Sequence, residues 1–482
     1  MLSDKMDQST EMTSQTDIDS VVVRSAAFKQ TEDLAFNDRH LIYDIATKAR
    51  EELSGHFQRS FAYFTIKHRS PMMVAEMVSF LHDNEPKIME IFGAYAHFDL
   101  KRISWSLQLL RDEIKENHEF KVFQGKAPDS EAWNQFIRNL DEDRNRWFSS
   151  VWLHAECYLY RRIWAIFRRS DTLSSYDYFA QKKIDATTSV VQLMSIVITG
   201  MRGVQRSQEN FQRMLKLALW SNRCDLSINK EAPSEEFLML MADYESDLLV
   251  DESGDIWRVL TEAWDPVYVD IVCDNAGFEL FTDLLLAEYL IEAGLACRVR
   301  FHVKAIPWFI SDVTKQDFLW MLNFLRRHEI AEIASFGRRL RRFMRNRSII
   351  LCETCYFWTS PHDYSQMKNL LPCLYVSLSE AALVIFKGDL NYRKLLGDIN
   401  WEYTSPLIDC LRGFLPTSVC ALRAIKSDIY CGLPTCMVEW LTEEDRHWMR
   451  TGKKGVIQVA IMHRLSGDAL VEDLQCKHHS KE

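Results

Sequence analysis

The sequence places oxygen-bearing side chains directly after one apolar run. The β-branched run Val267–Cys273 is followed by Asp274 and Asn275, and shortly afterwards by Glu279. A carboxylate and an amide oxygen are hard donors of the kind that Mg²⁺ and Mn²⁺ prefer. Glu279 would stand in the first turn of the next helix, where the helix dipole favours an acid. The pattern indicates a divalent-cation site, although the same residues could serve only as caps of that helix.

A second acidic residue follows the next apolar run. The run Cys297–Val303 leads through a short loop to Asp312, which precedes a helical pattern starting near Thr314. In an open α/β sheet, ligands bind beyond the carboxyl ends of the strands. Asp274, Asn275 and Asp312 would therefore form a three-ligand cation site with room for water and substrate. The alternative role of Asp312 is a cap for the helix near Thr314.

Two further segments combine acidic, amide and basic side chains at the ends of apolar runs. Asp389, Asn391 and Arg393 supply an acceptor, a mixed donor and acceptor, and a cation. This combination suits sugar hydroxyls and phosphate oxygens, although the segment could simply be a charged turn. Farther along, Arg423 and Lys426 are cations that could hold a phosphate near the end of the sheet.

Several common catalytic motifs are missing from the sequence. It contains no Gly-X-Gly, which removes the dinucleotide fingerprint and the usual glycine-rich methyl-donor loop, and it has neither a P-loop nor a Gly-X-Ser-X-Gly elbow. Glu332 stands where a zinc-protease motif beginning at His328 would need its second His. Cys352 and Cys355 have the spacing of a metal or redox pair, but no matching pair lies nearby, so we interpret them as buried thiols at a strand end.

Two kinds of element are needed to position these side chains. Residues 31–262 show mainly helical spacing of apolar residues, whereas beyond Trp264 short apolar runs alternate with helical patterns. Such alternation predicts a mainly parallel sheet covered on both faces. We therefore predict an α/β protein with a disordered leader (1–30), a helical N-terminal domain (31–262), a three-layer α/β/α catalytic domain (263–460) and a polar tail (461–482). The predicted strands are Val267–Cys273, Cys297–Val303, Ile349–Cys352, Leu383–Phe386 and Val419–Ala424.

Composition narrows the class of protein. The 482 residues carry a net charge of −10, which argues against a dedicated nucleic-acid binder because phosphate neutralisation needs a basic face. No apolar run is long enough to span a membrane, and the N-terminus has no signal-peptide pattern. The 12 Cys are scattered singly, so we expect reduced thiols in a cytoplasmic or nuclear protein. We interpret the basic segment Arg338–Arg347 as a solvated helix face, with nuclear targeting or nucleic-acid contact as the alternative.

Four motifs in this order resemble those of the metal-dependent damage-control phosphatases, long treated as a domain of unknown function. These motifs are Asp274–Glu279, Ile306–Asp312, Phe386–Lys394 and the pair Arg423 and Lys426. Motifs of the helical part match as well, and they are Phe61–Lys67, Arg146–Phe148, Glu156–Arg162 and Leu219–Ser227. The most similar branch includes a eukaryotic sugar-phosphate phosphatase that is also described as a protein-glutamate (acidic residue) O-methyltransferase. The resemblance covers about residues 35–460.

This resemblance implies that Asp274, Asn275 and Asp312 bind a divalent cation, which could be Mn²⁺, Ni²⁺, Co²⁺ or Mg²⁺. It implies fructose 1-phosphate and fructose 6-phosphate as substrates in metabolite damage control. The substrate contacts that it implies are Asp274, Asn275, Asp389, Leu390, Asn391, Tyr392, Arg393 and Lys426. One position departs from the branch, because Ala424 stands where the usual Arg-Thr-X-Lys motif has a hydroxyl. We expect this loss to bear on efficiency or substrate choice.

The predicted activity is hydrolysis of phosphomonoesters, with Lys426 and Arg423 holding the phosphate and the metal ion acting as Lewis acid and template. Whether Asp274 or a water molecule attacks phosphorus stays open. The alternative is an S-adenosylmethionine-dependent protein-glutamate O-methyltransferase with a role in the DNA-damage response, in which Glu279 and Asp312 would bind the methyl donor. The missing glycine-rich donor loop argues against it. A third interpretation treats the aromatic helical domain as a partner-binding platform, whose protein partners the sequence does not identify.

Overall fold

A twisted, mostly parallel sheet forms the centre of the protein. The computed structural model describes residues 42–201, 203–227 and 244–462. Its sheet has the strand order β1-β7-β6-β5-β2-β3-β4, and all neighbouring strands are parallel except β6 and β7. The strands are β1 Leu248–Asp251, β2 Tyr268–Val272, β3 Arg298–His302, β4 Ile349–Leu351, β5 Leu383–Lys387, β6 Ser418–Ala424 and β7 Gly455–Ala460.

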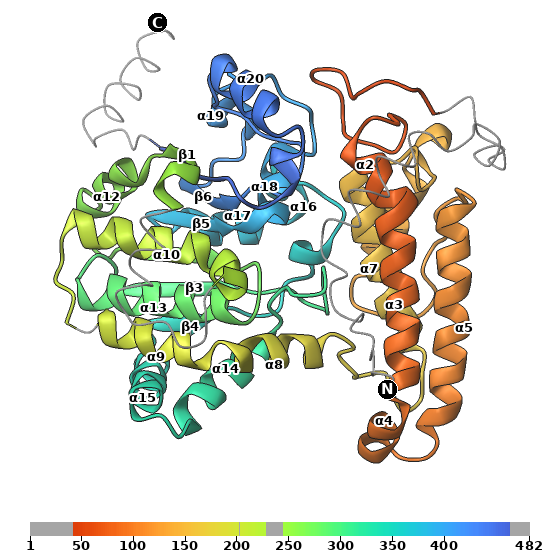
Figure 1. The fold of residues 1–482 in the computed structure, drawn as a ribbon, viewed down its shortest axis with the longest axis horizontal. Helices are drawn as coiled ribbons and strands as arrows, with labels where there is room; N and C mark the ends of the chain where they lie inside the picture. Colours follow the sequence, from red (N-terminus) through yellow and green to blue (C-terminus); the bar gives the residue numbers. More distant parts are fainter. Residues whose placement is uncertain (1–41, 202, 228–243, 463–482) are drawn as a thin grey trace, which may run out of the picture.

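Helices surround this sheet and also build a separate bundle. Those that precede β2 are α2 Phe61–Phe64, α3 Ser70–Asp83, α4 Glu85–Phe92, α5 Ala96–Lys115, α6 Ser130–Arg138, α7 Trp152–Arg168, α8 Ala180–Ser189, α9 Val191–Gly200, α10 Gln208–Ser227 and α12 Ser253–Thr261. Those that follow β2 are α13 Phe278–Glu292, α14 Lys315–Arg327, α15 Ala331–Arg345, α16 Met367–Leu370, α17 Pro372–Ser379, α18 Gly388–Leu396, α19 Leu407–Cys410 and α20 Thr435–Glu444. A π-helix, η3 Thr65–Arg69, joins α2 to α3. In Figure 1 the sheet with its covering helices lies on the left and the bundle of α3, α5 and α7 on the right.

The sheet separates two hydrophobic cores, because successive side chains of a strand point to opposite faces. Ile271, Ile385 and Leu422 pack into one core with residues of α9, α10, α13, α14 and α15. Their chain neighbours Val272 and Phe386 pack into the other core. On that second face α18 contacts β5 and β6, and α19 contacts β7. The predicted three-layer α/β arrangement with a mainly parallel sheet is therefore confirmed, and each of the five predicted strands is present.

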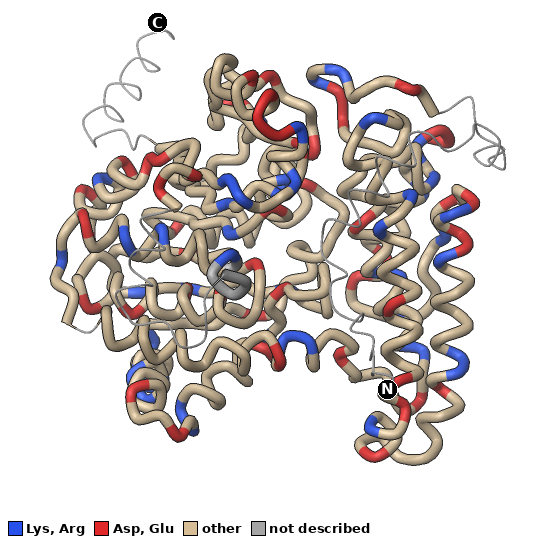
Figure 2. The backbone as a smooth tube through the Cα atoms, in the orientation of Figure 1, with Lys and Arg blue, Asp and Glu red and all other residues tan. Residues whose placement is uncertain are grey.

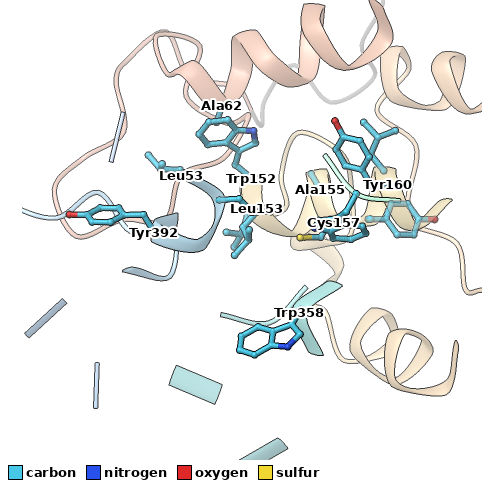
Figure 3. Close-up of a cluster of buried hydrophobic side chains, with 14 of the residues drawn as sticks. Leu53, Ala62, Trp152, Leu153, Ala155, Cys157, Tyr160, Trp358 and Tyr392 are labelled. Carbon is cyan, nitrogen blue, oxygen red and sulfur yellow. The ribbon is translucent and has the colours of Figure 1, made fainter. Parts of the chain in front are cut away.

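The helical bundle shares its core with the second face of the sheet. Helix α7 contributes many buried side chains to this core, because its apolar residues recur at helical spacing. Figure 3 shows Trp152, Leu153 and Cys157 of this helix between Ala62 of α2 and residues of the sheet region such as Trp358. Because one continuous core joins the two parts, the bundle is held against the sheet domain at a fixed position.

The domain boundary predicted at residue 262 does not match the sheet. Strand β1 pairs with β7, and α9, α10 and α12 pack into the core of the first face, yet all four precede residue 263. The sequence missed β1 because it has only four residues and a partly exposed pattern. The predicted leader (1–30) and nearly all of the predicted tail (461–482) lie outside the described residues.

The basic segment Arg338–Arg347 lies mostly on α15. Leu340 and Phe343 are buried and Met344 is partly buried, whereas Arg338, Arg341, Arg342 and Arg345 are exposed, as the sequence pattern predicts. Figure 2 shows acidic and basic positions interspersed along both parts of the molecule. None of the helices among the described residues is long and apolar enough to cross a membrane.

Candidate active site

The loops that follow β2 and β3 bring three predicted ligands together. The backbone N–H of Val313 donates a 2.8 Å hydrogen bond to the carbonyl oxygen of Asp274, and Asn275 and Asp312 form an antiparallel bridge. Asp274, Asn275 and Asp312 therefore meet at the carboxyl edge of the sheet, where the sequence predicted them. All three line one cavity of about 380 Å³.

The cavity lies between the sheet edge and the helical bundle. From the sheet side it is lined by Leu219, Asp274, Asn275, Glu279, Phe309, Ile310, Ser311, Asp312, Gly388, Asp389, Leu390, Arg393, Leu422, Ala424 and Lys426. From the bundle it is lined by Phe61, Thr65, Arg69, Ser70, Met72, Met73, Glu76, Trp152, Glu156, Leu159 and Tyr160. Acidic groups gather at the sheet edge, and the bundle adds aromatic, hydroxyl and cationic groups together with the carboxylates of Glu76 and Glu156. The cavity can therefore hold a polar ligand with an anionic end.

Neither Asp274 nor Asp312 caps a helix by its side chain. Helix α13 starts after Gly277 and has no side-chain cap. Helix α14 starts after Thr314, whose hydroxyl accepts from the N–H of Asp317 in a complete capping box. Thus α14 is capped by Thr314 and α13 has no side-chain cap, so neither Asp274 nor Asp312 has the capping role that the sequence left open. Both carboxylates are available to a ligand.

Burial perturbs both carboxylates. Burial, followed by the nearby carboxylates of Asp312 and Glu279, raises the pKa of Asp274 well above its usual value. Burial also raises the pKa of Asp312 to about 6, although Lys304 acts in the opposite direction. The Oδ2 atom of Asp312 lies 3.4 Å from Lys304 Nζ and accepts no well-formed hydrogen bond. Crowded, buried carboxylates of this kind are stabilised by a cation placed among them.

The amide of Asn275 bridges the acidic groups. Its Nδ2 donates to Asp274 Oδ2 at 2.7 Å and to Glu279 Oε2 at 2.8 Å, while its Oδ1 accepts from Ser311 Oγ at 2.5 Å. Rotating the amide by 180° would present its oxygen to the same carboxylates, and a cation at that position would favour the rotated form. Asn275 can therefore serve either the free or the metal-bound site.

Two buried lysines, Lys304 and Lys387, form ion pairs with acidic residues that line the cavity. Lys304 Nζ donates to the carbonyl oxygen of Cys273 at 2.9 Å and faces Asp312. Lys387 Nζ donates to Asp283 at 2.6 Å and contacts Glu279 at 3.2 Å. Asp274 has no such lysine salt bridge among the described residues, so its negative charge is the least compensated of the group.

The segment Phe386–Lys394 is a strand end followed by a helix rather than a charged turn. Helix α18 starts at Gly388, and only Gly388, Asp389, Leu390 and Arg393 of this helix line the cavity. A helix turns about 100° per residue, so the positions between these residues point elsewhere. The N-terminus of α18 thus faces the cavity, which favours a bound anion.

Two residues of α18 differ from their predicted substrate-binding role. Asn391 is fully buried, and its Nδ2 donates to Lys387 O at 2.7 Å while its Oδ1 accepts from the Tyr364 hydroxyl at 2.6 Å. The hydroxyl of Tyr392 donates to Gln458 at 2.8 Å on the other side of the helix. Neither side chain is among the described residues that line the cavity, so both support the helix instead.

The predicted phosphate-holding cations also separate into two roles. The guanidinium of Arg423 is fully buried, and it donates to Asp389 at 2.8 Å and to Ser427 Oγ at 2.9 Å. Arg423 therefore positions Asp389, and it is not among the described residues that line the cavity, which corrects its predicted contact with phosphate. Lys426 is exposed, lines the cavity, and has no salt-bridge partner among the described residues. Its positive charge opposes the rise in the pKa of Asp274.

Arg393 lines the cavity but is already occupied. It makes two 2.7 Å hydrogen bonds to Asp398, contacts Glu156 Oε2 at 2.5 Å, and lies 3.6 Å from the centre of the Trp152 ring. Because Glu156 and Trp152 belong to α7, this guanidinium joins α18 to the bundle. Its contact with a substrate can only be secondary to these ion pairs.

Gly388 is a site residue that sequence reasoning did not single out. Its φ of +80° is a conformation that side chains disfavour, and a Cβ at this position would lie 1.9 Å from Asp274 Oδ2. The glycine thus makes room for the carboxylate. Its place directly after an apolar strand was the signal that could have revealed it.

The residues of the bundle were also missed. Thr65, Arg69, Trp152 and Tyr160 reach the cavity from segments more than 100 residues away from the sheet motifs. A local pattern cannot show which helix faces a distant strand end. The available signal was that two of these residues, Thr65 and Tyr160, lie within motifs that resemble those of the family.

Comparison with known proteins decides the family. The damage-control phosphatase ARMT1-like domain matches residues 65–441. This chain belongs to that family. Damage-control phosphatase ARMT1 of Danio rerio is 36% identical over 438 residues, covering 86% of this chain and 98% of the relative. The protein of the same name from Mus musculus is 35% identical and covers 84% of this chain and 97% of the relative, and the human one is 33% identical with the same coverage.

Family membership confirms the resemblance and the predicted enzyme class, since family and relatives alike are named phosphatases. None of these names favours the methyltransferase alternative. A crystal structure of a DUF89 family protein from Pyrococcus horikoshii is 16% identical, with a TM-score of 0.39, and covers 74% of this chain and 95% of its own.

Proposed function

We propose that this protein is a divalent-metal-dependent phosphomonoesterase that acts on sugar phosphates such as fructose 1-phosphate and fructose 6-phosphate. The observation that carries the proposal is a single cavity that is lined by the buried carboxylates of Asp274 and Asp312 and by the cationic side chain of Lys426. Family membership supports the phosphatase class. The cavity volume of about 380 Å³ is within the range of small-molecule sites.

Asp274, Asn275 and Asp312 would hold the metal ion. No three His, Cys, Asp or Glu side chains of the described residues lie close enough together to hold a metal ion. The proposed ligands are two carboxylates and one amide, so they are not a group of that kind. The poorly satisfied Oδ2 of Asp312 and the raised pKa of Asp274 fit a bound cation. Oxygen ligands of this kind suit Mg²⁺ or Mn²⁺, and Co²⁺ or Ni²⁺ are the other candidates. When bound, the ion would supply Lewis-acid stabilisation of charge on the phosphoryl oxygens.

The protein's own groups would complete phosphate binding. Lys426 offers an ammonium group with three donors, and the N-terminus of α18 at Gly388 and Asp389 adds a partial positive charge. Asp389 accepts from the backbone N–H of Lys426 at 3.0 Å, which fixes the loop that carries the lysine. Lys304 and Lys387 keep Asp312 and Glu279 in place. Ala424 lines the cavity beside this loop, so the absent hydroxyl would have faced the substrate.

The test is phosphate release from fructose 1-phosphate and fructose 6-phosphate with Mg²⁺, Mn²⁺, Co²⁺ or Ni²⁺. We expect metal-dependent turnover that chelation abolishes and that Asp274→Ala lowers at least about 10³-fold, since charge stabilisation of this kind is worth several kcal/mol. Saturating metal should also raise the melting temperature of the wild type but not of the variant, because only the wild type binds it tightly. Equal turnover of the two proteins with added Mn²⁺ would contradict the site assignment.

A further inference from the structure

The wall that the helical bundle contributes to the cavity carries the buried hydroxyl of Thr65 and the exposed guanidinium of Arg69, which lies 5.5 Å from the centre of the Phe61 ring. Thr65 is only 4% exposed, and its hydroxyl has no hydrogen-bond partner among the described residues although it lines the cavity. Arg69 lines the same wall, and the structure shows no salt bridge for it within the described part of the chain. A buried hydroxyl that finds no partner costs free energy, so such a group calls for an explanation.

The π-helix explains why both groups face the cavity. In η3, the N–H of Ser70 donates to the carbonyl of Thr65, five residues earlier. This wider turn places residues four and five apart near one face, and Thr65, Arg69 and Ser70 all line the cavity. Single π-helical turns inside α-helices are rare and frequently occur at functional sites. Here the turn presents a hydroxyl and a guanidinium to the same space.

Thr65 and Arg69 line the cavity from the bundle, whereas Lys426 lines it from the sheet side. Lys426, on the sheet side, acts on the pKa of Asp274. Arg69 instead acts on two bundle residues, where it opposes the rise that burial causes in the pKa of Glu156 and of Tyr160. Of the three cationic side chains that line the described cavity, Arg393 is bound to Asp398 and Glu156. Lys426 and Arg69 therefore remain available on two different walls.

We propose that Thr65 and Arg69 bind the non-reacting, hydroxyl-bearing end of the sugar phosphate while its phosphate lies at the sheet edge. This inference rests on the proposed function and adds the group that selects the substrate. A sugar hydroxyl both donates and accepts, so it can satisfy the hydroxyl of Thr65 and accept from the guanidinium of Arg69. Sites built to bind a substrate hydroxyl discriminate strongly against analogues that lack it.

The experiment compares fructose 6-phosphate with phenyl phosphate, which carries the same reacting group but no hydroxyl tail. Both are assayed by phosphate release with Mn²⁺ on the wild type, Thr65→Val and Arg69→Met. We expect each variant to lower kcat/KM for the sugar phosphate by about 10-fold or more, as the loss of a hydrogen bond to an uncharged or charged donor predicts. We expect kcat/KM for phenyl phosphate to stay within about twofold, because its tail makes no such contact.

Lys67→Ala is the matched control, since Lys67 belongs to the same π-helix but is not among the described residues that line the cavity. It should leave both substrates unaffected. Thermal unfolding separates binding from folding: Thr65→Val keeps the side-chain shape and removes an unsatisfied buried hydroxyl, so its melting temperature should equal or exceed that of the wild type.

Different results of these assays would overturn the subsite alone or the subsite together with the substrate class. Unchanged kinetics in both variants, or equal losses on the two substrates, would overturn the proposed subsite while leaving the phosphatase assignment intact. A lower melting temperature for Thr65→Val would show that the hydroxyl serves the fold, which also overturns it. A wild type that hydrolyses phenyl phosphate but no sugar phosphate would overturn the substrate class and the subsite together.

Discussion

Replacing Gly388 by alanine tests whether the position of Asp274 governs the activity. The added Cβ would lie 1.9 Å from Asp274 Oδ2, whereas real Cβ atoms essentially never approach another heavy atom closer than 3.0 Å. The carboxylate would therefore have to move by about 1 Å. Displacements of about 1 Å at reacting groups can cost about 10²-fold in rate. We expect Gly388→Ala to lower kcat/KM for phosphate release by about 10²-fold or more.

Backbone strain has to be separated from this displacement. Gly388 has φ +80°, so alanine also adds a conformational cost of about 1–2 kcal/mol. Gly413 has nearly the same conformation, φ +85°, but a Cβ there would meet nothing within 4 Å. Gly413→Ala is therefore a matched control that carries the strain without the contact. In denaturant unfolding both variants should lose stability through this strain, and Gly388→Ala should lose more because its Cβ also meets Asp274.

Only Gly388→Ala should lose metal affinity and turnover, measured by isothermal titration with Mn²⁺ and by phosphate release. If Gly388→Ala kept wild-type turnover, or if Gly413→Ala lost as much, the carboxylate would not be the group whose position matters. The reasoning about Asp274 would then be refuted, whatever the stability data showed.

Two further predictions concern buried ion pairs. The pKa of His302 is raised to about 9, because Asp270 and Cys352 outweigh the lowering effect of burial. A folded-state pKa above the unfolded value of about 6.5 gives stability that is complete below pH 6.5 and is lost as the pH rises through 9. The free energy of unfolding of the wild type should therefore fall by up to about 3 kcal/mol between pH 6.5 and 9, whereas that of His302→Gln should not. An equal fall in both proteins, measured by denaturant unfolding, would contradict the assignment. Arg393→Met leaves the buried carboxylate of Asp398 unpaired, so it should cost about 3–5 kcal/mol in the same assay, and a loss below about 1 kcal/mol would show that the ion pair contributes little.

The parts of the site that depend on strand ends could be predicted from the sequence. Asp274 and Asn275 come just after β2, and Asp312 lies on the loop that follows β3. Parallel strands deliver such residues to one edge of the sheet. That rule needs no knowledge of distant contacts. Assigning different roles to Lys426 and Arg423 did require knowledge of distant contacts. Both are cations on the same short segment, and only their surroundings show which one is buried.

The roles of α18 were harder to predict for a different reason. Asp389, Asn391 and Arg393 read as one polar segment, yet a helix that starts at Gly388 turns Asn391 and Tyr392 into the protein. The spacing of Asp389 and Arg393, four residues apart, is the helical signal that was available. Strand β1 was missed since four partly exposed residues carry too little pattern.

The charges of the cavity suggest why a helical bundle is attached to this sheet. At the sheet edge, Lys304 and Lys387 offset Asp312 and Glu279, which leaves Asp274 for a cation and Lys426 for an anion. Nothing in that arrangement distinguishes one phosphate ester from another, since every substrate brings the same reacting group. In the proposed subsite the bundle would supply the groups that face the rest of the ligand. The Arg393 ion pairs with Glu156 and Asp398 fix the bundle against the sheet edge. Under this proposal the helices would select among esters, whereas the residues at the strand ends would carry out the hydrolysis.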